Sequence, residues 1–517
     1  MPWNRSSHII LCAVFGFIVG MHTGCGLEWG ALCPAACSLV ILGIVVRRRS
    51  LWYICPFALL YLVGVAYANA HKLVGCDDLR WGRNMALVIC PETVSEKVSE
   101  NVVHGYARVM EAPERYGKIV GHRVYFIIKY GADIPARGQK LRILAKVEYV
   151  GRQKSKPFLK FLRKNHVFLY ASNGRIEKYL NEKSRFSRIC EKYRQKFFNA
   201  LECGLSERND VGIITGMLTG SKHMLSGAQK SDFCDTGTAH VFAISGFHIG
   251  VISLFFDYFL RLLKLSRRVR TLPVIGVLFV YLSIVGPTPS SLRAYTMLVF
   301  YYAAGIFGRR SNTFSSFVNS AAVNICCAPE SVFSVSFLLS YGIVFGIVCI
   351  GANANKLLNV FRRNKMQFHS RSLPEKFGER ICSGIVENFC IAFAASVTSI
   401  PMSVEFFGNF SYLTIILNVI LVPLASMIIF FGAISLFFGI FNAFFLCTIA
   451  NKLALVPISL INFTLHCSRK IGHGLVNAHC PFEGFWMLAL VLVAAFGWYL
   501  AKVSGKITAN GRDTAAH

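Results

Sequence analysis

The sequence predicts a mainly α-helical polytopic membrane protein, with about twelve transmembrane helices and one small β domain inserted outside the membrane. Three observations support this fold class. Hydrophobic residues make up 54% of the 517 residues, above the roughly 45–50% of soluble domains, and the mean hydropathy is +0.49. Several apolar runs reach the ~20 residues that span a bilayer. Residues 71–208 contain no such run and have the composition of a soluble domain.

The chain is strongly basic, with a formal net charge of +29. In a membrane protein, the positive-inside rule and attraction to anionic lipids explain such an excess. A polyanionic substrate is the alternative explanation, and the charge alone favours the first. The eighteen cysteines lie mostly in apolar runs, which predicts small buried side chains rather than a disulfide framework. Charge and cysteine content therefore fit a membrane protein and leave its substrate open.

Residues 1–70 form the predicted N-terminal membrane segment. Apolar runs cover residues 9–20, 31–46 and 51–70, and three arginines at 47–49 separate the second run from the third. Because basic loops stay in the cytoplasm, we expect the N-terminus inside and the chain outside after residue 70.

Residues 71–208 are predicted to form a periplasmic domain. Residues 102–109, 123–129 and 141–150 have the composition of short strands, and glycines separate them. This pattern predicts a small β domain, either a barrel or an open sheet.

A basic stretch with interleaved aromatic residues follows these strands. Positive charge that follows phosphates, together with rings that stack on bases, is typical of single-strand binding. An amphipathic helix on anionic headgroups has the same composition, and both interpretations stay open. The predicted DNA-binding residues at the start of this stretch are Arg152, Lys154, Lys156, Lys160, Arg163 and Lys164.

Residues 209–440 form the predicted membrane core, and residues 441–517 add C-terminal helices and a short tail. Residues 211–220 are apolar but too short to span, which predicts a re-entrant or interfacial helix. The basic loops between later runs alternate so that both termini are expected in the cytoplasm. The predicted spans are 240–263, 272–285, 291–307, 314–327, 332–350, 384–400, 412–438, 441–465 and 485–501.

Polar residues interrupt the first of these spans. The segment Thr-Gly-Thr-Ala-His-Val-Phe-Ala-Ile-Ser-Gly-Phe-His-Ile-Gly covers residues 236–250. A polar group in hydrocarbon costs several kcal/mol unless it is paired or faces a cavity. Ser245 and Gly246 are expected to loosen or break the helix. On a regular helix His240 and His248 lie about 80° apart, so both fit one polar seam. That seam predicts interhelical hydrogen bonds, a pore lining, or a metal or proton site, although no third metal ligand has a clear spacing.

Four further polar residues lie in predicted spans. Arg293 falls near the outer end of its span, where it either snorkels to headgroups or presents a cation to a phosphate. Ser336 and Ser340 are four residues apart, which places both hydroxyls on one helix face. Asn418 lies between two prolines, which predicts a kinked helix with a polar lining.

The segment at residues 236–250 resembles the signature of the ComEC-type competence proteins. Residues 289–294 around Arg293, the Ser-Phe-Leu-Leu-Ser run at 336–340 and residues 401–423 resemble further elements of that family. The family has a Leu-Thr-Gly-acidic element where this chain has Ser221 after Leu-Thr-Gly. The resemblance covers residues 211–423 well and the β domain more loosely.

The resemblance implies an OB-like β domain and a channel that carries single-stranded DNA across the bacterial inner membrane during DNA uptake. It also implies partners, namely single-stranded DNA, a periplasmic DNA receptor, a cytoplasmic helicase or translocase, and membrane lipids. A homo-oligomer stays open.

We expect neither an enzyme nor a cofactor or metal. Many family members end in a metal-hydrolase domain, which needs a His-x-His-x-Asp-His cluster, and this chain has none. No serine triad or phosphate loop is evident. The alternative function is a small-molecule or lipid transporter of the inner membrane, which an inverted repeat among the spans would favour.

Overall fold

The fold is given by a computed structural model, which describes part of the chain. The described residues are 10, 13–14, 16–18, 21, 51–70, 81–97, 102–130, 135–150, 157–165, 167–221, 224–242, 244–365, 373–471, 475–477, 489–490, 492–497 and 499–503. The predicted span at 31–46 lies outside them, as do Arg152, Lys154 and Lys156.

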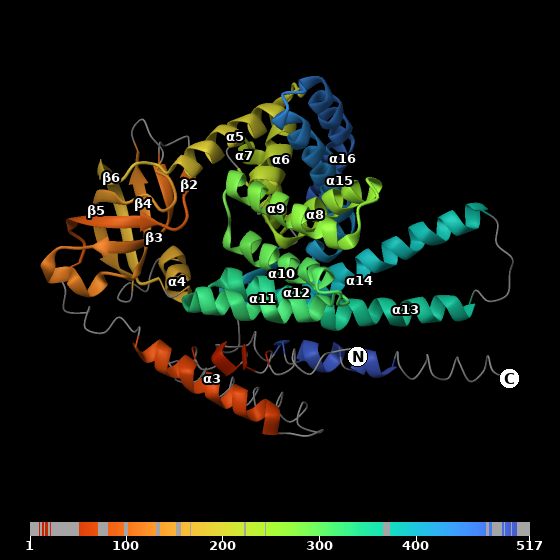
Figure 1. The fold of residues 1–517 in the computed structure, drawn as a ribbon, viewed down its shortest axis with the longest axis horizontal. Coiled ribbons are helices and arrows are strands. Elements are labelled where there is room, and N and C mark those ends of the chain that lie inside the picture. Colours follow the sequence, from red (N-terminus) through yellow and green to blue (C-terminus); the bar gives the residue numbers. More distant parts are fainter. Residues whose placement is uncertain are drawn as a thin grey trace.

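Strands and helices form two bodies that lie side by side (Figure 1). The six strands of the first body are β1 (Asn84–Pro91), β2 (Ser95–Lys97), β3 (Val102–Glu111), β4 (Arg123–Lys129), β5 (Leu141–Tyr149) and β6 (Leu169–Tyr179). The sheet order is β1-β5-β6-β4-β3-β2, and an additional β1–β3 pairing closes five of these strands into a barrel. The predicted barrel is therefore confirmed.

The barrel has Greek-key connectivity. β1, β3 and β4 pair antiparallel in succession, and β5 returns to pair with β1. β6 then pairs antiparallel with β5 and parallel with β4. A five-stranded Greek-key barrel is the architecture of the OB fold, which agrees with the OB-like domain expected from the resemblance.

Alternation along the strands fills the barrel interior. Residues of β4 alternate between half-buried and buried positions, and Ile89, Val103, Phe126 and Ile143 are buried inside. Alternate side chains of a strand point to opposite faces, so the intervening residues lie on the outer face. Of the predicted strands, β4 has the predicted bounds, whereas β3 and β5 differ at one end. β1, β2 and β6 were not predicted.

The helical body contains most of the remaining described residues. Its helices are α3 (Leu51–Ala70), α5 (Arg185–Glu202), α6 (Arg208–Thr219), α7 (Gly227–Asp235), α8 (Gly246–Leu262), α9 (Arg267–Val285), α10 (Pro289–Ile306), α11 (Thr313–Cys327), α12 (Val335–Gly346), α13 (Ala352–Lys365), α14 (Leu373–Phe407), α15 (Leu413–Ile440) and α16 (Phe444–Ile471). Shorter elements are the 3-10 helices η2 (Glu114–Ile119), η4 (Ala239–Phe242) and η5 (Pro329–Phe333), the π-helical turn η6 (Ile347–Gly351), and the hairpin of β7 (Asn409–Ser411) and β8 (Leu475–Asn477).

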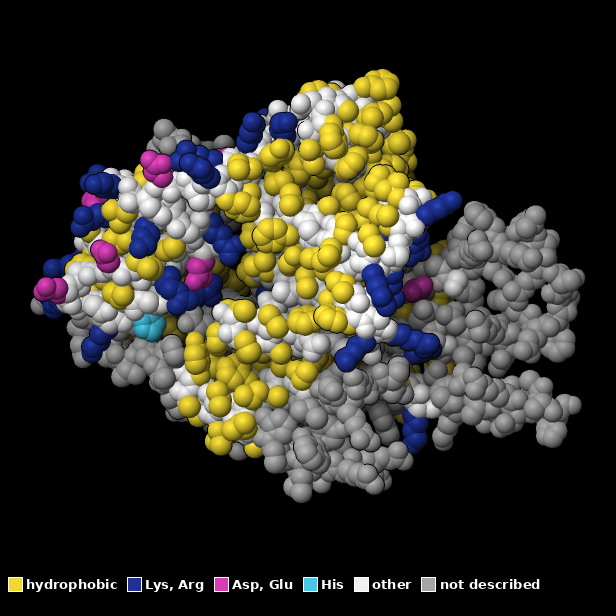
Figure 2. Space-filling model, in the orientation of Figure 1, with side chains coloured by type: hydrophobic (Ala, Val, Ile, Leu, Met, Phe, Trp, Pro, Cys, Tyr) yellow, Lys and Arg dark blue, Asp and Glu magenta, His cyan; other side chains and the backbone are white. Residues whose placement is uncertain are grey.

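Five helices within the described residues are long and apolar enough to cross a membrane. They are Arg267–Val285, Val335–Leu358, Ser383–Phe407, Leu413–Ile440 and Phe444–Ser468. Hydrophobic side chains cover much of the visible face of the helical body, whereas Lys and Arg are frequent on the barrel (Figure 2). The protein is thus a mostly helical, multi-pass membrane protein, and the predicted count of twelve spans is not confirmed.

One reason for the smaller count is that several predicted spans form shorter helices. α8 has 17 residues and α11 has 15. The short helix predicted at 211–220 is present as α6, with every residue from Val211 to Thr219 buried. It lies inside the body rather than across its surface.

The main core lies where α5, α6, α8, α9, α15 and α16 meet. Ile213, Ile428 and Ile458 are fully buried there. Two polar side chains fix α5 against this core, because Ser435 and Asn451 both donate hydrogen bonds to the Ala200 carbonyl, at 3.1 and 2.8 Å. A Cβ at Gly439 would lie 2.5 Å from the Ala200 Cβ, so the close approach of α15 to α5 requires glycine.

A helix of the barrel domain, α4 (Pro157–Lys164), joins the two bodies. Phe161 stacks on Phe407 at the end of α14, with ring centroids 6.3 Å apart. Asn165 Oδ1 accepts a 2.9 Å hydrogen bond from the Val335 N–H at the start of α12. The barrel therefore contacts the helical body at the N-terminal end of α12.

Candidate functional site

The polar segment at 236–250 begins with a tight turn between α7 and η4. The Thr236 and Thr238 hydroxyls lie 2.7 Å apart, and the Thr236 carbonyl accepts hydrogen bonds of 3.2 Å from both Ser411 and Thr414. Gly237 has φ +71°, and a Cβ there would lie 2.5 Å from Thr414 Oγ1. Left-handed backbone and close packing both require glycine, so this turn is locked against the start of α15.

The helix breaks at Ser245, as the sequence predicts. Ser245 is the N-cap of α8, and His248 completes a capping box. The Ser245 N–H donates to His248 Nδ1 at 3.2 Å, and Ser245 Oγ lies 2.9 Å from the same atom. A backbone N–H can only donate, so Nδ1 is the acceptor and neutral His248 carries its proton on Nε2.

The prediction that His240 and His248 share one helical seam is wrong. His240 lies in η4, before the break, and its side chain is exposed, with Nδ1 3.2 Å from the Gly237 carbonyl oxygen. His248 is only 1% exposed. The 80° spacing assumed a continuous helix, and the Ser245 cap removes that assumption.

Arg293 is buried in α10 and reaches α12. Only 4% of the Arg293 surface is exposed. Nη2 donates to the Ser336 carbonyl at 2.7 Å and to Ser336 Oγ at 2.8 Å. The guanidinium carbon lies 5.9 Å from the Phe337 ring centroid and 6.0 Å from that of Tyr341. Rings and neutral oxygens therefore surround this cation.

No carboxylate pairs with Arg293 among the residues that the structure describes, and its Nε makes no hydrogen bond to them. A buried charge is costly unless it is paired. By contrast, the buried Arg270 pairs with Asp257 at 2.8 Å. Among the described residues, Arg293 is thus a buried cation held by neutral groups alone.

The N-termini of α8, α10 and α12 lie close to Arg293. A Cβ at Gly246, the first residue of α8, would lie 3.3 Å from the Ala294 Cβ. Thr288, the N-cap of α10, donates to the Ile244 carbonyl at 3.3 Å. Ser336 is the second residue of α12. Each helix N-terminus carries a partial positive charge of roughly half a unit, so this junction favours an anion.

The other predicted pore residues are placed differently. Ser340 lies one turn beyond Ser336 on α12 and is half-buried. Asn418 is half-buried on α15, where its Oδ1 makes no hydrogen bond to the described residues. Among the described residues, hydrogen bonds join Arg293 to Ser336, and Gly246 lies beside Ala294. These contacts do not join His240 or Asn418 to this group.

The barrel carries a second candidate surface, on the outer face of β3, β4 and β6. Tyr106 is the cross-strand partner of Tyr125, and Tyr125 is the partner of Tyr170. These three side chains form a row, which we call the tyrosine row. Ring centroids are 5.2 Å apart for the first pair and 6.3 Å for the second. Aromatic rows of this kind stack with nucleobases.

Cations flank the tyrosine row. Arg123 lies over the Tyr106 ring at 5.2 Å and pairs with Glu92 at 2.8 Å. Burial, together with its two tyrosine neighbours, raises the pKa of Tyr125 to about 12. The phenol therefore stays neutral at physiological pH and adds no negative charge beside the surface.

The predicted basic residues before and within α4 are only partly placed. Arg152, Lys154 and Lys156 lie outside the described residues, and the side chains of Lys160, Arg163 and Lys164 are not described either. The backbone places the last three on α4, in the connection between β5 and β6. In OB folds this connection and the faces of the second and third strands bind oligonucleotides. The segment that sequence reasoning singled out thus lies beside the tyrosine row, which that reasoning missed.

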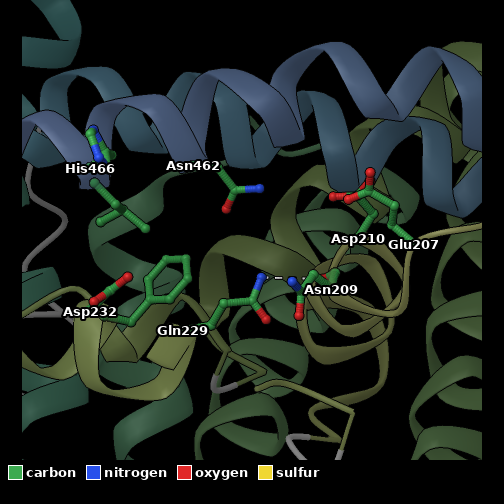
Figure 3. A pocket seen from close by; sticks show the side chains of 9 residues that line it. Glu207, Asn209, Asp210, Gln229, Asp232, Asn462 and His466 are labelled. Atoms are coloured by element: carbon green, nitrogen blue, oxygen red, sulfur yellow. Dashed lines mark hydrogen bonds between the residues drawn. The ribbon is translucent and has the colours of Figure 1, made fainter. Parts of the chain in front are cut away.

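A polar pocket of about 230 Å3 lies elsewhere, where α6 and α7 face α16 (Figure 3). Gln229 Nε2 donates to the Asn209 carbonyl at 3.4 Å within it. The lining residues are Glu207, Asn209, Asp210, Gln229, Asp232, Phe233, Asn462, Leu465 and His466. Across the described part of the chain, neither this pocket nor any other place gathers three His, Cys, Asp or Glu side chains at metal-binding distance.

Most of the helical body matches a known family model. Residues 217–502, more than half of the chain, match the model described as "Competence protein". ComE operon protein 3 of Bacillus subtilis is 21% identical over 227 residues, which cover 44% of this chain and 26% of that relative. An uncharacterized protein of Aquifex aeolicus is 23% identical over 425 residues, which cover 80% of this chain and 86% of that protein. No solved structure matches.

Proposed function

This chain belongs to the competence protein family, and we propose that it is an inner-membrane channel that carries single-stranded DNA into the bacterial cytoplasm. The observation that carries the proposal is Arg293, a buried guanidinium without a carboxylate partner among the described residues. Three helix N-termini add positive potential beside it. A phosphate group supplies the negative charge that this junction lacks, and a guanidinium binds phosphate in a fixed geometry.

In this proposal the barrel receives the strand outside the membrane. The tyrosine row provides stacking for bases, and the basic β5–β6 connection provides charge for phosphates. Partners follow from the same role: a periplasmic receptor hands over the strand, and a cytoplasmic helicase or translocase pulls it. The matched region covers about a quarter of ComE operon protein 3, 26% of its length, so these activities are proposed for this chain from its own residues.

We propose that the chain itself is not an enzyme and that the cytoplasmic motor supplies the energy. The Ser245–His248 contact is compatible with this view. A serine hydroxyl 2.9 Å from an imidazole is also the arrangement of a nucleophile and its base. Here the same imidazole nitrogen accepts the Ser245 N–H, so the contact caps α8.

Uptake of labelled DNA tests the proposal. A transformable bacterium whose own channel is replaced by this chain should import DNA into a nuclease-protected interior. Arg293→Ala should lower this import by about 30-fold or more, because loss of a buried charged contact costs ~2 kcal/mol or more. The matched control is Arg268→Ala, which removes an exposed arginine at the α8–α9 end. Equal import by both variants at equal membrane levels would contradict the proposed role of Arg293.

The alternative, a small-molecule transporter, is favoured by one observation. The pocket in Figure 3 has several acidic and amide side chains and the size of a small solute. Asp210→Asn and Glu207→Gln should leave DNA import unchanged if the strand passes Arg293. Normal DNA import in Arg293→Ala, together with loss of small-solute uptake in Asp210→Asn and Glu207→Gln, would support the alternative instead.

A further inference from the structure

We infer that α4 is a lid that occupies the tyrosine row until a DNA strand displaces it. Phe158 of α4 lies against the row, with its ring centroid 5.1 Å from Tyr125 and 6.0 Å from Tyr170. Both contacts are edge-to-face. A nucleobase that stacks on Tyr125 needs this same space. The chain's own ring therefore holds the position that the proposed ligand requires, and the inference rests on the proposed function.

The contact that holds the lid is smaller than the barrel core. Its cluster has four buried members, Leu159 and Leu162 of α4 itself and Val150 and Val167 on either side of that helix. Phe158 itself remains 40% exposed. Aromatic pairs contribute modestly beyond the area that they bury. Phosphate contacts and stacking of several bases can outweigh such a contact, whereas they could not open the fully buried barrel core.

The far end of α4 is tied to the helical body through Asn165, beside the stack of Phe161 on Phe407. Asn165 Nδ2 donates to the Phe161 carbonyl at 2.8 Å, which caps the C-terminus of α4. Its Oδ1 accepts the Val335 N–H at 2.9 Å, which caps the N-terminus of α12. Asn165 therefore holds two helix ends together, and α4 cannot move far while both bonds last.

Displacement of α4 would also affect the junction around Arg293. The next residue after Val335 is Ser336, whose carbonyl and hydroxyl hold the Arg293 guanidinium. Loss of the Asn165 cap leaves the first turn of α12 with one more unsatisfied N–H. When a strand binds the barrel, the first turn of α12 should therefore loosen. This is the turn in which Ser336 accepts the hydrogen bonds of Arg293. In this way α4 makes the inner cation available only when the outer surface is loaded.

Binding of fluorescein-labelled oligothymidylate to the full-length protein in nanodiscs tests the lid. Phe158→Ala should bind about 2- to 10-fold more tightly than wild type, because no ring competes for the tyrosine row. Adding Tyr125→Ala to Phe158→Ala should remove this gain. Phe186→Ala removes an exposed ring from α5 and serves as the matched control, with wild-type affinity expected.

Hydrogen exchange of the peptide that contains Val335 tests the link to α12. In wild type the oligonucleotide should increase exchange of this amide, and in Phe158→Ala exchange should be raised without oligonucleotide. If Phe158→Ala binds no more tightly than wild type while Tyr125→Ala weakens binding, α4 is a fixed part of the site and the lid is wrong. Unchanged exchange at Val335 on binding overturns the link. If no variant, wild type included, binds oligonucleotide, the proposed function itself is contradicted.

Discussion

The barrel and the helical body each present an arginine beside aromatic rings, but the two arginines differ in what balances their charge. Arg123 lies over Tyr106 and pairs with Glu92. Arg293 lies near Phe337 and Tyr341, and no described carboxylate pairs with it. A neutralised cation adds little net attraction for phosphate, whereas an unbalanced buried one attracts strongly. We therefore propose that the barrel holds a strand mainly through its bases and that the core holds it through its phosphates.

The largest effect is expected from Arg293→Met, which separates function from stability. Removal of a buried unpaired charge should leave the melting temperature unchanged or raise it, because the desolvation cost of the guanidinium disappears. DNA import should nevertheless fall by about 30-fold or more. Thermal unfolding in detergent and import at matched membrane levels check the two halves. A lower melting temperature with normal import would show that Arg293 only supports packing. The proposed difference between Arg293 and Arg123 of the barrel would then be wrong.

A smaller effect is expected at the barrel. Tyr106→Ala should weaken oligothymidylate binding by about 5- to 100-fold, the range for loss of one base stack of ~1–3 kcal/mol. Tyr106→Phe keeps the ring and should bind like wild type. Fluorescence anisotropy with the full-length protein measures both. If the phenylalanine variant loses as much as the alanine variant, the hydroxyl matters and stacking does not explain the barrel.

Salt dependence distinguishes the two regions most directly. The logarithm of the binding constant falls with the logarithm of salt concentration by about 0.7 per phosphate contact on a single strand. Arg293→Met should reduce this slope by about 0.7, because one phosphate contact is lost. Tyr106→Ala should weaken binding at every salt concentration without a change in slope. If the salt dependence of binding had the same slope in Arg293→Met and Tyr106→Ala, the barrel and the core would not differ in how they bind phosphates and bases.

The tight turn at Gly237, which packs against the start of α15, gives a stability test within the helical body. Gly237→Ala should lower the free energy of unfolding by about 2–4 kcal/mol, through left-handed strain and overlap with Thr414. Gly250→Ala is the control, because a Cβ there meets nothing within 4 Å. The helical alanine should be neutral or mildly stabilising. Chemical denaturation of both variants in detergent makes the comparison, and equal stabilities would show that the turn tolerates a side chain.

Features set by neighbouring residues could be predicted from the sequence. Features that depend on contacts between distant segments could not. Strand-like composition between turn residues identified β3, β4 and β5, and the Ser245–Gly246 pair identified the break before α8. β6 was read as part of a basic stretch, because its outward residues Arg175 and Lys178 hide the alternation. The tyrosine row could not be found, because Tyr106, Tyr125 and Tyr170 are far apart in the chain and become neighbours only through strand register.

The site around Arg293 likewise combines residues that the sequence identified with a contact that it could not predict. Arg293 and Ser336 were singled out separately, since a charge and a hydroxyl are unusual in apolar runs. Their contact follows from the packing of α10 against α12, which no local pattern specifies. The lack of a carboxylate partner for Arg293 among the described residues is likewise a result of tertiary packing, because the chain contains many acidic residues elsewhere.

The smallest expected effect concerns pH and again separates the two regions. Burial raises the pKa of Tyr125 to about 12, above its ordinary value near 10. The folded barrel therefore keeps the phenol protonated, and the stability that this adds is fully present below pH 10 and is lost as pH rises toward 12. Oligothymidylate affinity should stay constant from pH 8 to about 9.5, since no phenolate forms beside the phosphates. Tyr125→Phe should reduce the loss of thermal stability above pH 10. A wild-type barrel that loses affinity near pH 9, with Tyr125→Phe unaffected, would show that the phenol ionises normally and that the tyrosine row is more open than its packing against α4 indicates.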